Sequence, residues 1–213
     1  MPTQLDYETA RQIAVETLLQ DDLEKCCANA GVSLQSLSSG GKKVCIPYIG
    51  HDYTLTIQND RVVFDEAPRP LKISDEVLLL HYLITATGAP VLEEWITFRE
   101  VPSGSFYYAS FVKRAIAPLL KCFGERPSLL KEVSKTVGQV LDEPGDIALK
   151  VFGLPRVPVV LSLWKGDEEF PPEANVYLDK SVPEYLSTED IAYLSGAVVY
   201  KTMGISRQLG KKS

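Results

Sequence analysis

The sequence has no long apolar run and almost no clustered positive charge. A membrane-spanning helix needs about 18–20 consecutive apolar residues, and none of the 213 residues begins such a run. Lysine plus arginine number 22 against 28 aspartate plus glutamate, so the net charge is −6. Nucleic-acid binding needs a basic face, and adjacent basic residues occur only as isolated pairs, such as Lys42 with Lys43 and Lys211 with Lys212. We expect neither a membrane span nor a nucleic-acid partner.

Histidine and cysteine are too few for the common metal sites. There are 2 histidines and 4 cysteines, and the cysteines form no C-x-x-C pair. The usual zinc and iron–sulfur spacings are therefore missing. The motifs H-E-x-x-H, C-x-x-C-H and D-x-H-x-x-G are absent as well. We expect no metal centre and no iron–sulfur cluster in this chain.

The N-terminal segment lacks the features of an export signal. It carries Asp6, Glu8 and Glu16, without a basic region followed by an apolar one. We therefore expect a cytoplasmic protein whose cysteines are free thiols. Cys26 and Cys27 are adjacent in a segment of helical character, and we expect them to pack as small apolar residues.

The composition is that of a globular protein. Hydrophobic residues make up 45% of the chain and charged residues 23%. Neither a repeat nor a linker divides the sequence, so we expect one domain over residues 1–213, with a tail frayed from about residue 206.

The hydrophobic spacing predicts helices and strands in separate blocks. The expected helices cover residues 6–20, 23–30, 76–87, 106–123, 129–141 and 187–203, and Ser74 or Asp75 caps the third. The expected strands cover residues 44–48, 53–57, 62–64, 147–152, 157–164 and 175–179, and residues 33–41 form a polar loop. Such segregation favours an α+β fold, in which an N-terminal antiparallel meander and a C-terminal hairpin pack against about six helices.

Three segments together resemble a known family. They are LLLHYL at 78–83, EWITFRE at 94–100 and LWKGDEEFPP at 163–172. The succession resembles a prokaryotic domain-of-unknown-function family, mostly from anaerobes, of which some members are fused to a corrinoid-protein-type iron–sulfur segment. The resemblance implies a role in anaerobic one-carbon or cobamide-linked metabolism, and it supplies no activity.

The third segment holds the densest group of chemically active side chains. Asp167, Glu168 and Glu169 follow an expected strand, with Trp164 before them and a proline pair after them. Such carboxylates bind a cation or a ligand amine, or act as acid and base. Alternatively, the run is a solvated acidic turn with apolar anchors.

Three further groups are candidates for ligand binding. His81 lies in an apolar helix. There it is either a metal ligand, a base or an axial ligand of a tetrapyrrole metal, or a buried neutral imidazole that is hydrogen-bonded to a structural partner. Arg99 precedes a Ser-Gly-Ser loop and is suited to grip a carboxylate or phosphate, or to form a structural ion pair. Tyr107 and Tyr108 either line a pocket for a flat ligand or pack in the core.

We therefore expect a small-ligand-binding or accessory protein that holds a tetrapyrrole-like or corrinoid ligand. Its ligand-binding residues would be His81, Arg99, Tyr107, Tyr108, Trp164, Asp167, Glu168 and Glu169. Two alternatives stay open. One is a hydrolase or transferase that uses the three carboxylates with Arg99, and the other is an adaptor for an iron–sulfur or corrinoid protein partner. The sequence leaves open whether there is any catalysis, and it identifies no catalytic residue.

Overall fold

The computed structural model describes residues 4–65 and 70–210 and confirms an α+β fold. The chain divides into two compact units. Unit 1 comprises residues 1–90, 154–156 and 184–186, and unit 2 comprises residues 91–153, 157–183 and 187–213. Each unit is described by itself below. The single domain over residues 1–213 stays a prediction.

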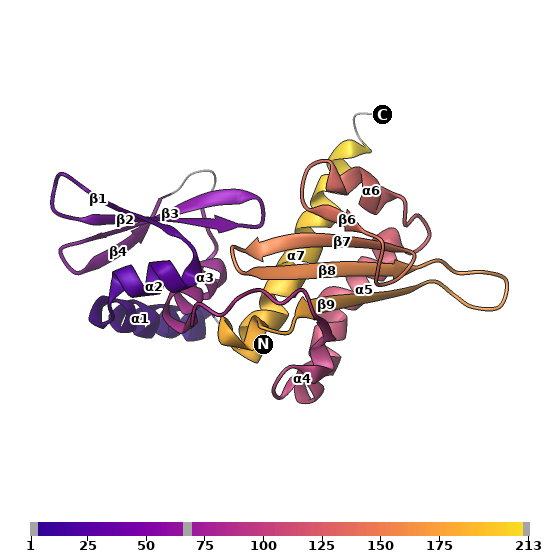
Figure 1. Cartoon of the computed structure of the whole chain (residues 1–213), viewed down its shortest axis with the longest axis horizontal. Coiled ribbons are helices and arrows are strands. Elements are labelled where there is room, and N and C mark those ends of the chain that lie inside the picture. Colours follow the sequence, from indigo (N-terminus) through magenta and orange to yellow (C-terminus); the bar gives the residue numbers. More distant parts are fainter. Residues whose placement is uncertain (1–3, 66–69, 211–213) are drawn as a thin grey trace. The chain divides into compact units, whose positions relative to one another are not determined.

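Unit 1 joins a four-stranded antiparallel sheet to three helices (Figure 1). The helices are α1 (Gln4–Gln20), α2 (Leu23–Ala30) and α3 (Ile73–Thr85). The strands are β1 (Ser33–Ser36), β2 (Lys42–Tyr48), β3 (His51–Gln58) and β4 (Arg61–Phe64), paired in that order.

The predicted meander of unit 1 is confirmed. Val44 pairs with Leu55 and Ile46 with Tyr53, and all four side chains are buried because alternate residues of a strand point to one face. Two turns connect the strands, and one of them uses left-handed Asn59 and Asp60. Apolar alternation and short connections together fix this register.

Two local expectations for unit 1 are wrong. The polar segment that follows Val32 begins with a strand, because Ser33 to Ser36 pair with β2 as an edge strand and need no buried side chains. Helix α3 begins at Ile73, so its N-cap is Lys72 rather than Ser74 or Asp75. The helix therefore begins before the residues whose side chains are best suited to cap it.

Helix α2 is confirmed at both ends. Oδ1 of Asp22 accepts hydrogen bonds from the backbone N–H groups of Glu24 and Lys25, at 3.0 and 3.2 Å. Gly31 ends the helix in the left-handed conformation that glycine adopts most readily. The four cysteines are free, and Cys26 and Cys27 are buried, as predicted.

Unit 2 is built on a five-stranded antiparallel sheet in the order β5-β9-β8-β7-β6. Its strands are β5 (Trp95–Thr97), β6 (Gln139–Leu141), β7 (Ile147–Leu154, whose last residue groups with unit 1), β8 (Val157–Trp164) and β9 (Glu173–Asp179). The predicted C-terminal hairpin is therefore the centre of a larger sheet, which is separate from the sheet of unit 1.

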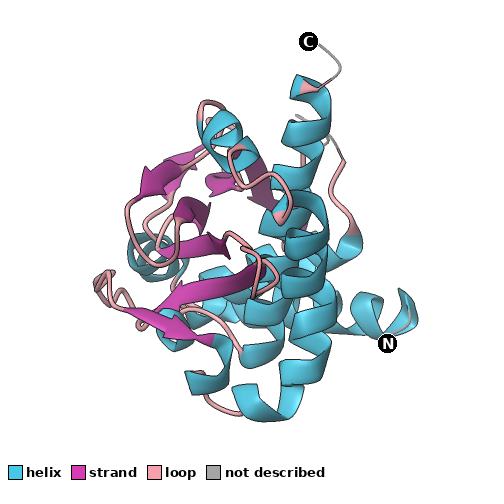
Figure 2. Cartoon of the chain, turned by 90° about the vertical axis from the view of Figure 1, so that its right-hand side faces the viewer, coloured by secondary structure: helices cyan, strands magenta, loops and turns pink. Residues whose placement is uncertain are grey.

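The helices of unit 2 pack beside this sheet. They are η1 (Phe98–Glu100), α4 (Gly104–Phe111), the π-helical turn η2 (Val112–Ile116), α5 (Ala117–Phe123), α6 (Leu129–Ser134) and α7 (Thr188–Leu209). A further short helix, η3 (Val182–Glu184), follows β9, and its last residue groups with unit 1. Figure 2 shows α7, the helix that leads to the C-terminus, alongside the strands. Ser187 caps α7 by accepting a hydrogen bond from Asp190 N.

Two boundaries in unit 2 differ from those expected. The helix expected over residues 129–141 ends at Ser134, and Gly138 then turns the chain with a φ of 84° so that β6 pairs with β7. Val140 and Leu141 suit a strand and a helix equally, so pairing with β7 decides between them. Helix α7 continues to Leu209, so the chain is helical beyond residue 206, and residues 211–213 lie outside the described ones.

No helix among the described residues combines the length and the apolar character needed to cross a membrane.

Candidate functional site

The site is built on the loop that joins β8 to β9, residues 165–172, which we call the acidic loop. Asp167 organises it. One carboxylate oxygen of Asp167 accepts hydrogen bonds from the N–H groups of Glu169 and Phe170, both at 2.8 Å, and Asp167 N donates to Phe170 O at 2.9 Å. The predicted cluster of three carboxylates is thus divided. Asp167 shapes the turn, and Glu168 and Glu169 extend from it.

Hydrogen bonding also sets the charge of Asp167. The N–H groups of Phe170 and Glu169 lower the pKa of this carboxyl group, because they stabilise its ionised form. The ionised form of Asp167 is therefore the form that these two N–H groups favour.

The acidic loop forms one side of a cavity of about 530 Å³. The other side is Gly124, Glu125 and Pro127, which follow α5. Glu125, Asp167, Glu168 and Glu169 give this lining four carboxylates against one basic residue, Lys165. Sequence reasoning missed Glu125, because it is a single acidic residue far from the acidic loop along the chain.

The rest of the cavity lining is apolar and stiff. Phe170 is 67% exposed, which is high for so large an apolar side chain. Pro171 and Pro172 follow it, and Gly166 approaches Pro172 so closely that a Cβ at Gly166 would lie 2.8 Å from the proline ring nitrogen. The cavity therefore offers an aromatic ring beside carboxylates.

Arg99 and Tyr108, two of the predicted ligand-binding residues, lie together in the structure, and they contact each other. The guanidinium carbon of Arg99 lies 3.9 Å from the centre of the Tyr108 ring, a cation–π contact. Tyr107 lies next to them in α4 and is 45% exposed. None of these three residues lines the acidic cavity.

The remaining two candidates lie elsewhere. Trp164 ends β8 half-buried, with its ring centre 6.5 Å from that of Tyr177. His81 is half-buried in α3 and belongs to unit 1, whereas the other candidates belong to unit 2. Buried leucines precede His81 in α3, but its own side chain retains solvent contact.

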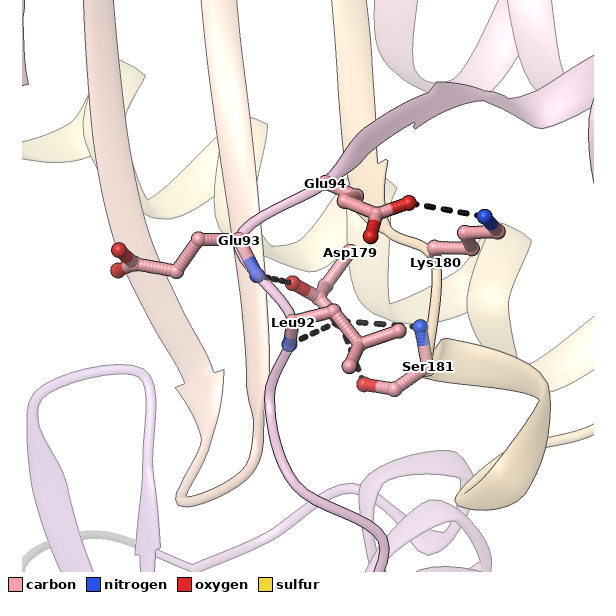
Figure 3. A network of polar contacts seen from close by, with 6 residues as sticks. All are labelled: Leu92, Glu93, Glu94, Asp179, Lys180 and Ser181. Atoms are coloured by element: carbon pink, nitrogen blue, oxygen red, sulfur yellow. Dashed lines mark hydrogen bonds and ion pairs between the residues drawn. The ribbon is translucent and has the colours of Figure 1, made fainter.

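Sequence reasoning also missed a buried carboxylate, Asp179 at the end of β9. Figure 3 shows the N–H groups of Leu92, Glu93 and Ser181 directed at it. The distances to the carboxylate oxygens are 3.1, 2.6 and 3.0 Å, and the hydroxyl of Ser181 donates as well. An aspartate at a strand end resembles any turn residue in sequence, so no signal marked it.

The Asp179 network holds the chain at the entry to β5. Glu93 adopts a left-handed φ of 56°, and its carboxylate binds Lys150 at 2.6 Å. Glu94 accepts from Lys180 at 2.8 Å, and this bond raises the pKa of the Lys180 ammonium group. Asp179 has its acceptors occupied by protein donors, so it positions the backbone and is not a ligand group.

Within residues 4–65 and 70–210, no group of three or more histidine, cysteine, aspartate or glutamate side chains is arranged to hold a metal ion.

Comparison with known proteins gives one family and no characterised relative. A model of the family described as "Domain of unknown function (DUF3786)" matches residues 22–201, which is most of the chain. No curated protein and no solved structure matches it significantly. The matched range contains all the candidate residues and the acidic cavity. The chain belongs to the DUF3786 family.

Proposed function

We propose that this chain is a small-ligand-binding protein whose ligand is a small organic cation, an ammonium or guanidinium compound, bound in the acidic cavity. One observation carries the proposal: the cavity of about 530 Å³ is lined by Glu125, Glu168 and Glu169 together with Phe170, whose side chain is exposed. Carboxylates bind ammonium and guanidinium groups through charge-assisted hydrogen bonds, and an aromatic face adds cation–π attraction.

The local geometry supports different roles for Asp167 and for the two glutamates that follow it. Asp167 is engaged by the backbone of its own turn, so it fixes the loop. The described residues show no ion pair or hydrogen bond to the carboxylates of Glu168 and Glu169. These two side chains therefore meet the ligand, and the prolines limit the entropy lost on binding.

The alternative reading as a hydrolase or transferase needs Arg99 beside the three carboxylates. Arg99 lies over Tyr108 instead and does not line the cavity. The geometry therefore supports binding better than it supports catalysis by this set of residues.

The proposal has a metabolic setting that rests on the family resemblance alone. In that setting the protein is an accessory of anaerobic one-carbon or cobamide-linked metabolism in the cytoplasm, next to an iron–sulfur or corrinoid protein. A tetrapyrrole-like ligand held by His81, Tyr107, Tyr108 and Trp164 also stays a prediction.

Isothermal titration calorimetry with agmatine, which carries both a guanidinium and an ammonium group, tests the cation site. We expect saturable binding that weakens as salt rises, since exposed charges are screened. The double variant Glu168→Gln, Glu169→Gln should weaken binding by about tenfold or more, equivalent to about 1.4 kcal/mol.

The matched control is Glu173→Gln, which removes an exposed carboxylate from β9 just outside the cavity lining. It should leave the affinity for agmatine unchanged. Equal weakening by the control would mean that general negative charge attracts the ligand, and absence of binding to the unaltered protein would overturn the proposal.

A further inference from the structure

The first turn of α4 displays aromatic side chains that the fold does not cover. Phe106 is 86% exposed, the highest value among the exposed large hydrophobic residues of the described chain, and Tyr107 is 45% exposed. Their ring centres are 5.6 Å apart in an edge-to-face arrangement. Exposed aromatics of this size are typical of binding surfaces. We call the surface formed by Phe106, Tyr107, Arg99 and Lys113 the α4 tip.

The buried side of α4 packs against η1. Phe98 and Phe111 are fully buried and stacked, with ring centres 4.0 Å apart. Gly104 lies so close to η1 that a Cβ there would be 1.8 Å from the carbonyl oxygen of Phe98. The helix is therefore fixed on its inner side, and the outward position of Phe106 follows from that packing.

Two exposed cations, Arg99 before α4 and Lys113 after it, accompany the exposed rings of the α4 tip in a chain whose net charge is −6. Arg99 lies over Tyr108, and Lys113 is exposed about two helical turns after Phe106, on the same side of the helix. The carboxylate of Glu100 keeps its negative charge and is held in place by η1, where it accepts from the N–H and the hydroxyl of Thr97, both at 2.8 Å. The tip thus combines an aromatic anchor with cations.

The acidic cavity has the complementary properties on the same unit. It combines carboxylates with Phe170 and three prolines. Figure 1 shows α4 and the β8–β9 loop at separate ends of unit 2, so the tip of one chain lies away from its own cavity. Every copy of the chain therefore carries two surfaces of opposite charge, the α4 tip and the acidic cavity.

We propose that the α4 tip docks into the acidic cavity of a second copy of this chain. Phe106 packs against Phe170 and the prolines, and Arg99 and Lys113 pair with Glu125, Glu168 and Glu169. This inference rests on the proposed function, because it names a protein-borne cation as an occupant of the same site. The contact joins two different surfaces, so it builds head-to-tail rings or chains.

Sedimentation velocity across a wide range of protein concentrations tests the docking. The unaltered protein should form dimers and larger species as concentration rises, and salt should weaken them. Phe106→Ser should remove the tip, and Glu168→Lys with Glu169→Lys should reverse the cavity charge. Each variant alone should associate at least about tenfold more weakly, as expected for a central anchor or its partner.

Mixing the two variants is the decisive step. The charge-reversed chain retains its tip and the Phe106→Ser chain retains its cavity, so a mixture should form a one-to-one dimer and nothing larger. Phe152→Ser is the control, since Phe152 is also exposed, at 46%, and lies in β7 outside both surfaces. It should associate as the unaltered chain does.

The outcomes separate this inference from the proposed function. A protein that stays monomeric at every concentration but binds agmatine retains the cation site and overturns the docking. Association that Phe106→Ser leaves unchanged also overturns it. Association lost in both variants, with no agmatine binding to monomeric Phe106→Ser, supports the docking and removes the small-molecule function.

Discussion

The two units bury different kinds of side chain. The buried polar residues of the described chain are Ser162, Asp179, Ser181, Ser195 and Thr202, and all of them belong to unit 2. Unit 1 has an interior of aliphatic and aromatic side chains, and its buried polar atoms include tyrosine hydroxyls, the thiols of Cys26 and Cys27 and Nε of Arg156. Unit 2 also holds the acidic cavity and the α4 tip. Both units bury apolar side chains, and unit 2 adds buried serine, threonine and aspartate side chains to its core.

Among the substitutions considered, loss of the Asp179 carboxylate should lower the stability of the protein most. Asp179→Ala leaves the N–H groups of Leu92, Glu93 and Ser181 without their acceptor. The bonds from Ser181 are buried and those from Leu92 and Glu93 are partly buried, so we expect the free energy of unfolding to fall by about 3 kcal/mol. Chemical denaturation measures the loss.

Asp179→Asn provides the comparison variant. Its remaining carbonyl oxygen replaces Oδ1, which accepts from Leu92 and Ser181, and it loses the bond from Glu93. We expect a smaller loss than with alanine. Hydrogen exchange should increase at residues 92–97 in both variants and stay unchanged in β2 and β3. Equal exchange in both units would contradict the separation drawn here.

Two glycines of unit 2 should respond oppositely to alanine. In Gly104→Ala the new Cβ meets the carbonyl oxygen of Phe98 at 1.8 Å, and the resulting overpacking should cost about 2–3 kcal/mol. In Gly204→Ala the Cβ meets nothing within 4 Å inside α7, so we expect a gain of about 0.5–1 kcal/mol. Thermal unfolding compares them, and equal losses would contradict the packing described for α4.

Unit 1 should be less sensitive to loss of one polar group. The hydroxyl of Tyr82 donates to Ala30 O at 2.6 Å and accepts from Arg156 N at 3.2 Å. Tyr82→Phe keeps the ring packing and should lower the free energy of unfolding by about 1–2 kcal/mol. A loss as large as that of Asp179→Ala would show that unit 1 depends on polar contacts equally.

The smallest effect concerns a buried thiol of unit 1. Burial raises the pKa of Cys27 from 9.0 to about 11, because the thiolate is poorly solvated there. The folded state therefore favours the neutral thiol. Its contribution to stability is complete below about pH 9 and is lost as pH rises towards about 11.

Cys27→Ala isolates this contribution. In the variant, the free energy of unfolding should fall less steeply between pH 9 and about 11 than in the unaltered protein. Denaturation at a series of pH values measures both slopes. Identical slopes would mean that the thiol titrates normally in the folded state.

Sequence patterns were sufficient where the contacts are local. The β2–β4 meander was predicted, and the caps at Asp22, Gly31 and Ser187 follow known capping rules, because neighbouring residues specify them. The β6 strand was mistaken for helix, because its apolar residues suit both periods and only distant β7 decides between them. Local periodicity carries no information about such long-range pairing.

The candidate site shows the same limit. Asp167, Glu168 and Glu169 were expected to act together, since they are adjacent in sequence, and they do line one cavity. Glu125 joins them only through the fold. The donors to Asp179 at Leu92 and Glu93 lie 87 and 86 residues before it, so its burial leaves no local pattern.

The central claim is that unit 2 binds a cation in the acidic cavity, and a titration of isotope-labelled protein with agmatine tests it most directly. Amide chemical shifts report which residues feel the ligand. The account predicts saturable shifts in the acidic loop and at residues 124–127, with none along α3 around His81. Shifts centred on His81, or no shifts at any ratio of agmatine to protein, would contradict it.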